Sequence, residues 1–124
     1  TPEQFFSQQP LEQKIVYNEE ESTLYYDEEH GYELKWLIPA SNEKEMEPVI
    51  ITFDKNGEYK TFEPSLSETF IYVIDGSIRL ILGEATYIAK KGQTMYYQAT
   101  EPHQISNNGR GKSRALIVAT ESYL

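Results

Sequence analysis

The chain has 124 residues, a length that suits one domain built around one core. It contains no cysteine, which excludes disulfides, thiolate metal sites and cysteine nucleophiles and favours a reducing, cytoplasmic compartment. Its formal net charge of −9 argues against direct nucleic-acid binding, because affinity for phosphate backbones comes from Lys and Arg.

The first ten residues predict a linker remnant, with a helical turn or two over 2–8. Thr1 suits the N-cap of such a turn and Pro2 its first helical position. The chain opens on Thr1 rather than Met, as a segment entered from something upstream would. We therefore expect a fragment of a longer protein, with a linker at 1–10 and a single domain at 11–124.

Short apolar and aromatic bursts follow, separated by turn signals, and they predict nine strands. The predicted strands cover residues 15–17, 24–26, 32–38, 49–53, 70–74, 78–82, 86–89, 94–97 and 115–120. Turns are predicted at 56–57, 75–76, 83–84, 91–92 and 108–109. This pattern is typical of an all-β sandwich or barrel.

The acidic residues are concentrated in the first half of the chain. Up to Glu63 there are fifteen Asp and Glu against five Lys, and beyond it five acids against six bases. The runs at 19–21 and 27–29 are interpreted as solvated strand ends and turns, with an acidic binding surface as the alternative. The apolar stretches are too short to span a bilayer and no signal-peptide pattern is present, so we expect no membrane association.

Two segments of the second half carry a more specific pattern. Residues 68–83 form a strand, an Asp-Gly turn and a second strand, which predicts a hairpin, and residues 84–107 continue to a histidine and an asparagine. The pattern resembles the two motifs of the cupin (RmlC-like) superfamily, with five residues in register: Gly76, Gly92, Pro102, His103 and Asn107. The resemblance implies an all-β fold, a small double-stranded β-helix (cupin or jelly-roll) barrel with extra N-terminal strands.

The layout of the first half resembles the C-terminal cupin domain of XRE-type helix-turn-helix transcription regulators. This part of the resemblance is carried by a linker with two Phe, by several acidic strands and by the segments 36–39 and 47–53. It implies that a DNA-binding domain precedes this chain, that DNA is contacted only through that domain, and that the barrel senses an unidentified small-molecule effector. A homodimer is expected.

Metal-binding cupins commonly use two histidines and a glutamate of the first motif and the histidine of the second. Alignment on Gly76 places Glu63 and Ser65 at the two histidine positions, Thr69 at the glutamate position and His103 at the last. One ligand in four matches. We therefore expect a metal-free pocket and no cofactor, with a weak metal site at Glu63 and His103, or one completed by Glu68 across a bulge, as alternatives.

The predicted ligand pocket joins these positions to nearby aromatic and sulfur-containing side chains. His103 can hydrogen-bond a polar ligand beside Ser65 and Thr69, or it can be a histidine satisfied by its neighbours at a strand end. Strand alternation predicts that residues 69, 71 and 73 share one face of their strand and that 95 and 97 share one face of theirs, and the cavity is assigned to this set. Trp36 can also line the barrel mouth, and core packing is the alternative for every aromatic residue. The predicted ligand-binding residues are Glu63, Ser65, Thr69, Tyr72, Met95, Tyr97 and His103.

Three functions from different classes are compatible with the sequence. The leading hypothesis is a metal-free effector-sensing domain of a transcription regulator, which is not an enzyme. The second is a metal-dependent cupin enzyme of the isomerase or dioxygenase type. The third is a structural dimerisation module that pairs exposed edge strands across a two-fold axis. The sequence lacks the nucleophile elbow of a serine hydrolase and the spacing of a phosphate-binding loop.

Overall fold

The computed structural model describes residues 13–121 and 124, and its regular structure is nearly all β, as the sequence predicts. Two short 3-10 helices, η1 (Glu19–Glu21) and η2 (Ser41–Glu43), are the helical elements of the described residues. None of these helices has the length and apolar character that a membrane span needs. The strands are β1 (Thr23–Asp27), β2 (Tyr32–Trp36), β3 (Met46–Phe53), β4 (Glu68–Asp75), β5 (Ser77–Leu82), β6 (Ala85–Lys90), β7 (Thr94–Gln98), β8 (His103–Asn107) and β9 (Ser113–Thr120).

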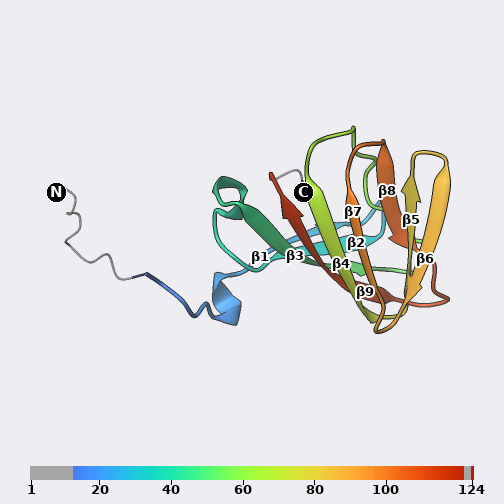
Figure 1. Cartoon of the computed structure of the whole chain (residues 1–124). Helices are drawn as coiled ribbons and strands as arrows, with labels where there is room; N and C mark the ends of the chain where they lie inside the picture. The colour runs from blue at the N-terminus through green and yellow to red at the C-terminus, as the bar shows by residue number, and fades with distance from the viewer. Residues whose placement is uncertain (1–12, 122–123) are drawn as a thin grey trace.

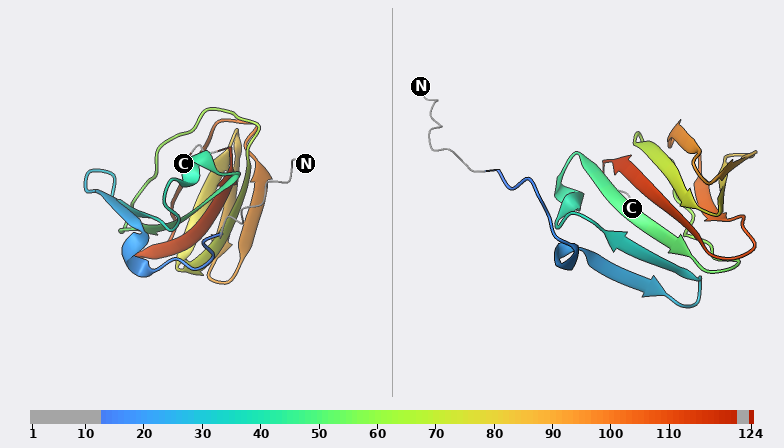
Figure 2. Two further views of the ribbon diagram at one scale, coloured as in Figure 1. Left: turned by 90° about the vertical axis from the view of Figure 1, so that its left-hand side faces the viewer. Right: turned by 90° about the horizontal axis from the view of Figure 1, so that it is seen from below.

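The strands form two antiparallel sheets (Figure 1). The larger sheet has the order β1-β2-β3-β9-β4-β7, and the smaller one the order β6-β5-β8. Single bridges from Glu58 to Ser106 and from Phe62 to His103 place the segment between them along β8. The view from below in Figure 2 shows the large sheet as a broad layer running from β1, with the small sheet turned against its far end. A compact barrel results, with the extra N-terminal strands widening one wall.

The chain repeatedly passes from one sheet to the other. β4 pairs with β7 and β9, whereas β5 pairs with β6 and β8, so the turn at Gly76 is a corner between the sheets. The predicted hairpin at 75–76 is therefore wrong, although the glycine is needed: its φ of +78° is a left-handed conformation that side chains disfavour. The predicted turn at 83–84 does close a hairpin, between β5 and β6.

Two strand predictions differ from the structure. Residues 15–17 are not a strand, and Ile15 and Val16 are 72% and 76% exposed. β8 was not predicted, because only Ile105 in its sequence HQISN is apolar, and its alternation is hidden by polar side chains that form hydrogen bonds when buried. The predicted helical turn at 2–8 and the linker at 1–10 lie outside the described residues.

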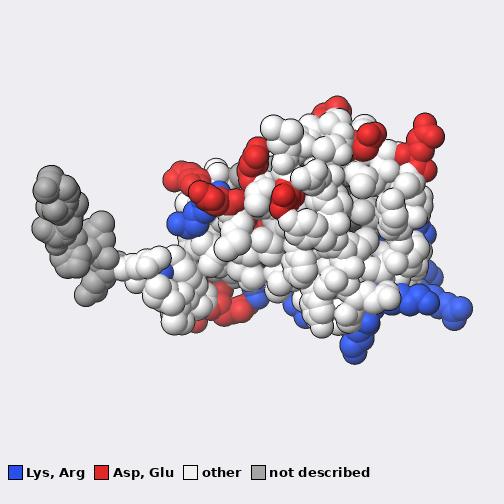
Figure 3. All heavy atoms as spheres, in the orientation of Figure 1, with Lys and Arg blue, Asp and Glu red and all other residues white. Residues whose placement is uncertain are grey.

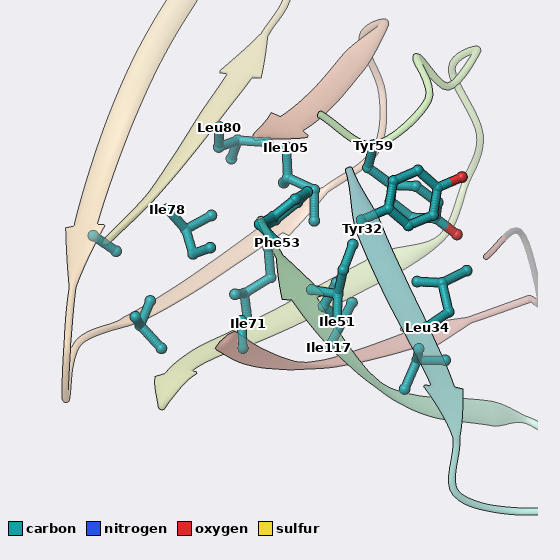
Figure 4. Packing of buried hydrophobic residues seen from close by; sticks show 14 of the residues in the cluster. Tyr32, Leu34, Ile51, Phe53, Tyr59, Ile71, Ile78, Leu80, Ile105 and Ile117 are labelled. Carbon is teal, nitrogen blue, oxygen red and sulfur yellow. The ribbon is translucent and has the colours of Figure 1, made fainter. Parts of the chain in front are cut away.

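Alternating side chains of both sheets fill the interior (Figure 4). In β3 every second residue is buried, and Phe53 reaches into the space between the sheets beside Ile71 and Ile105. The predicted shared face of residues 69, 71 and 73 is confirmed, since all three are at most 1% exposed. Burying the large aliphatic and aromatic side chains stabilises the fold by roughly 1.5–3 kcal/mol each.

A series of aromatic contacts runs across this interior. The ring of Tyr32 meets that of Tyr59 at 5.0 Å between centroids, and Tyr59 meets Phe62 at 5.2 Å, both edge-on. Burial is the main cause that raises the pKa of Tyr32 to about 12. The hydroxyl of Tyr59 donates to the carbonyl of Leu124, which ties the last residue to the same end of the barrel.

Candidate functional site

A cleft opens between the two sheets, where β7 at the edge of the large sheet approaches β5 and β6 of the small one. Its volume is about 310 Å³, at the lower end of the range of small-molecule sites. Six residues line it: Leu80, Leu82, Tyr87, Met95, Tyr96 and Tyr97. The cleft can therefore take a small ligand or one moiety of a larger one.

Strand alternation explains the character of the cleft wall. Leu80 and Leu82 are two residues apart on β5, and Met95 and Tyr97 are two apart on β7, so each pair shares a face of its sheet. Leu80 is 2% exposed, and the other three are half-buried and pack against the core. The cleft thus has an apolar floor that continues into the barrel interior.

Two tyrosines form the rim of the cleft. Tyr87 is 50% exposed and Tyr96 is 66% exposed. The phenol of Tyr96 donates a hydrogen bond to the carboxylate of Glu68 on β4, and this bond is the main cause that raises the pKa of Tyr96. Phenolic rims suit ligands that combine an apolar or aromatic body with a polar end.

His103 lies behind the cleft floor. Its Nδ1 is 2.9 Å from the carbonyl oxygen of Glu101, and since a carbonyl only accepts, Nδ1 carries the hydrogen. Its ring stacks on Phe62 at 5.3 Å and receives the edge of Tyr97 at 5.7 Å between centroids. With 3% exposure, His103 is part of a packed aromatic interior, and the ring of Tyr97 contacts it from the side of the cleft.

The other predicted ligand-binding residues are divided between interior and surface. Thr69 is buried and pairs with Tyr97 across β4 and β7, close to the cleft but not in its wall. Ser65 is half-buried in the segment before β4, where its hydroxyl accepts from the backbone N–H of Ser67 at 3.1 Å. Glu63 is exposed in the same segment.

Tyr72 and Trp36 lie away from the cleft. Tyr72 is 40% exposed on the outer face of β4, because it falls between the inward residues 71 and 73. Trp36 lines a different hollow, where its indole N–H donates to the carboxylate of Glu47. Of the predicted set, the structure brings Met95 and Tyr97 into the cleft wall, with Thr69 and His103 behind them.

Sequence reasoning missed four of the six cleft residues. Leu80 and Leu82 carried a usable signal, since alternation along the predicted strand 78–82 places them on one face. Tyr87 and Tyr96 carried none, because their position depends on which strands meet across the barrel.

The residues at the family's metal-binding positions do not fit a divalent metal ion. Glu63 is exposed, and the positions between it and His103 hold the hydroxyls of Ser65 and Thr69, which are poor ligands for transition metals. Across residues 13–121 and 124, no group of three or more His, Cys, Asp or Glu side chains is placed to hold a metal ion.

We predict that divalent metals do not stabilise this protein. A site filled at one hundred times its dissociation constant would add about 2.7 kcal/mol to the free energy of unfolding. After treatment with a chelator, the melting temperature should be unchanged by Mn²⁺, Fe²⁺, Co²⁺ or Zn²⁺. A rise in melting temperature that disappears in His103→Phe would contradict this and favour a metal-dependent cupin enzyme.

Comparison with known families agrees with the barrel and its motifs. The Cupin_2 family, a cupin domain, matches residues 49–119, more than half of the chain. The chain belongs to the cupin family. No curated protein sequence matches it.

Solved structures with the same fold include both regulators and an enzyme. An HTH_3 family transcriptional regulator from Vibrio cholerae is 14% identical with a TM-score of 0.66, and the match covers 82% of this cupin chain and 56% of that protein. The Cupin_2 domain of an XRE family transcriptional regulator from Enterobacter cloacae is 13% identical with a TM-score of 0.64, covering 73% and 96%. The cupin enzyme HppE in its Fe(II) form is 16% identical with a TM-score of 0.70, covering 86% and 60%.

These likenesses are below 25% identity and show the fold alone. The cupin chain spans less than two thirds of the length of the Vibrio regulator and of HppE. Because the family includes both regulators and enzymes, the function of this chain has to be argued from the chain's own site.

Proposed function

We propose that this cupin is the effector-sensing domain of a transcription regulator and that it binds a small, largely apolar or aromatic molecule in the cleft between its sheets. The observation that carries the proposal is the cleft itself, with an apolar floor of Leu80, Leu82 and Met95 and a rim of two tyrosines. The cupin domains of regulators among the structural neighbours support it.

The position of the cleft suits a sensor. Its walls come from both sheets, so a bound molecule touches β5 and β6 on one side and β7 on the other. β7 is an edge strand that pairs with β4 alone among the named strands. A ligand that favours one separation of the two sheets shifts the population toward that arrangement by its difference in affinity.

Tyr97 provides a path from the cleft into the barrel. Its ring lines the cleft and contacts His103, which in turn stacks on Phe62. A shift of Tyr97 on binding would therefore displace His103 of β8 and Phe62, which is bridged to His103. In the proposed regulator, this change alters a homodimer in the cytoplasm and reaches DNA through a domain upstream of the chain.

A metal-dependent enzyme is the second candidate, because HppE shares the fold. The side chains at the family's metal positions favour the sensor, since they include one imidazole and no buried carboxylate beside it. Metal titration of the chelator-treated protein separates the two functions.

Filling the cleft with a larger side chain should weaken ligand binding. Indole is a suitable aromatic probe for this test. We predict that indole causes saturable amide shifts at Leu80, Met95 and Tyr97 in ¹H–¹⁵N NMR spectra. Leu82→Trp puts an indole ring into the cleft and should weaken binding at least about tenfold, equivalent to about 1.4 kcal/mol.

Ile81→Trp is the matched control for this experiment. Ile81 neighbours Leu82 on β5 but faces outward with 37% exposure, so indole affinity should stay within about twofold. Equal weakening by both variants, or shifts confined to residues outside the cleft, would contradict the proposal.

A further inference from the structure

Another hollow lies on the outer face of the small sheet. It has a volume of about 230 Å³, and its walls are residues 56–58, Arg79 of β5, and residues 106–109 at the end of β8. Arg79 alternates with the inward residues Ile78 and Leu80, so the hollow and the cleft lie on opposite faces of the sheet. Its walls are polar, in contrast to those of the cleft.

Arg79 brings a positive charge into this hollow. Its Nη2 donates to the side-chain oxygen of Asn108 at 2.7 Å and its Nη1 to the hydroxyl of Ser106 at 3.4 Å. Both acceptors are neutral, and these two bonds use two of the five N–H groups of the guanidinium. Within residues 13–121 and 124 no carboxylate lies within 4.0 Å of this half-buried group.

The wall formed by residues 107–109 is held by buried and part-buried hydrogen bonds. The side-chain oxygen of Asn107 accepts from the backbone N–H of Gly109 at 2.7 Å and from the hydroxyl of Ser113 at 2.8 Å. The amide of Asn108 donates to the hydroxyl of Ser77 at 3.1 Å, which turns its oxygen toward Arg79. A wall fixed in this way loses little conformational entropy when a ligand binds.

Basic side chains gather beside the hollow, although the protein is acidic and two acidic residues are also close: Glu58 is in its wall, and Asp54 is hydrogen-bonded to the wall residues Gly57 and Asn107. Arg110 and Lys112 lie in the loop that continues its wall, and the β6–β7 turn with Lys90 and Lys91 is bonded to the same end of the barrel through Gly76. In Figure 3, blue Lys and Arg side chains gather at the lower right, where the loop into β9 lies in Figure 1, while acidic side chains lie along the top and left. These basic side chains attract anions, and the acidic residues close to the hollow weaken that attraction.

We propose that this hollow binds a small oxyanion, either a phosphate or a carboxylate group, through Arg79. The planar guanidinium matches both groups with paired N–H···O bonds. Glu58, exposed at the rim, opposes an anion by its charge, so its removal should strengthen binding. The site is independent of the cleft and of the proposed sensor function.

The test is an NMR titration of the whole chain with inorganic phosphate and, separately, with acetate, each at constant ionic strength. Saturable shifts are expected at the amides of Gly57, Asn108 and Gly109. Arg79→Gln should weaken binding at least about tenfold, and Glu58→Gln should strengthen it about twofold or more. A response to phosphate alone identifies a phosphate site, and a response to acetate alone a carboxylate site.

Arg110→Gln is the matched control, because it removes the same charge from an exposed position in the neighbouring loop. It should change affinity less than about threefold. If it weakens binding as much as Arg79→Gln, or if shifts grow linearly without saturation for both anions, the proposal is overturned. If Arg79→Gln fails to fold, Arg79→Lys takes its place. This variant keeps the charge but loses the paired geometry, so undiminished affinity would also overturn the proposal.

Discussion

Replacing Asn107 by alanine is expected to lower the free energy of unfolding by about 3–5 kcal/mol. Asn107 is 6% exposed, and its side chain makes four hydrogen bonds. Its amide donates to the carbonyls of Asp54 and Gly111, at 2.8 and 2.7 Å. Alanine would leave the carbonyl of Gly111, the N–H of Gly109 and the hydroxyl of Ser113 without this partner, whereas the carbonyl of Asp54 keeps the N–H of Gly57 at 2.9 Å. Each orphaned buried group costs about 1–3 kcal/mol.

Two further variants separate hydrogen bonding from packing. Asn107→Asp keeps the volume but turns a carboxylate oxygen toward two carbonyls, so it should destabilise the protein at neutral pH nearly as much as alanine. Asn108→Ala, at the next position, should cost less than about 1.5 kcal/mol, because Asn108 is half-buried. Urea denaturation of the three variants is the measurement. Stability of Asn107→Asp within about 1 kcal/mol of the natural protein would mean that packing dominates.

Much of the barrel could be predicted because its strands alternate. In β3 and β9 every second residue is buried, and Val, Ile and Phe fill most of the large inward positions. Residues 15–17 show the limit of this reasoning, since Ile, Val and Tyr favour a strand locally but find none to pair with among the described residues. β8 shows the converse, because its pairing with β5 makes a strand of a mostly polar sequence.

The sheet corners could not be predicted from local sequence. An Asp-Gly turn between two apolar runs is typical of a hairpin, and the same two residues here carry the chain from one sheet to the other. Whether such a turn closes a hairpin depends on which strands pair with the two strands beside it. Here β4 pairs with β9, which lies far away along the chain, and not with β5.

The candidate site was predictable only in part, for the same reason. Alternation along β7 correctly groups Met95 with Tyr97, but Tyr87 and Tyr96 join them through the approach of β6 to β7. The family motif identifies where metal ligands would stand without saying what replaces them. In this chain the ring of Phe62 stacks on His103, an arrangement set by the bridge between the two residues.

Replacing Gly76 by alanine should lower the free energy of unfolding by about 2–5 kcal/mol. Its φ of +78° costs an L-residue about 1–2 kcal/mol. A Cβ at this position would also stand 2.1 Å from the hydroxyl of Ser113 and 2.9 Å from the carbonyl of Lys112. Ser113 cannot move away cheaply, because its hydroxyl accepts from the backbone N–H of Ser77 and donates to Asn107.

Alanine variants of two other glycines separate the two parts of this free energy, the backbone strain and the close contact. Gly92 has a φ of +87° but no atom within 4 Å of where an alanine methyl group would stand, so Gly92→Ala should cost only the strain, about 1–2 kcal/mol. Gly111 has open space and no left-handed φ, so Gly111→Ala should be neutral or stabilise by up to about 1 kcal/mol. Urea denaturation of the three variants measures the series. If Gly76→Ala and Gly92→Ala cost the same, the close approach of the corner to Ser113 contributes nothing, and the left-handed backbone alone explains why glycine is required where the chain changes sheets.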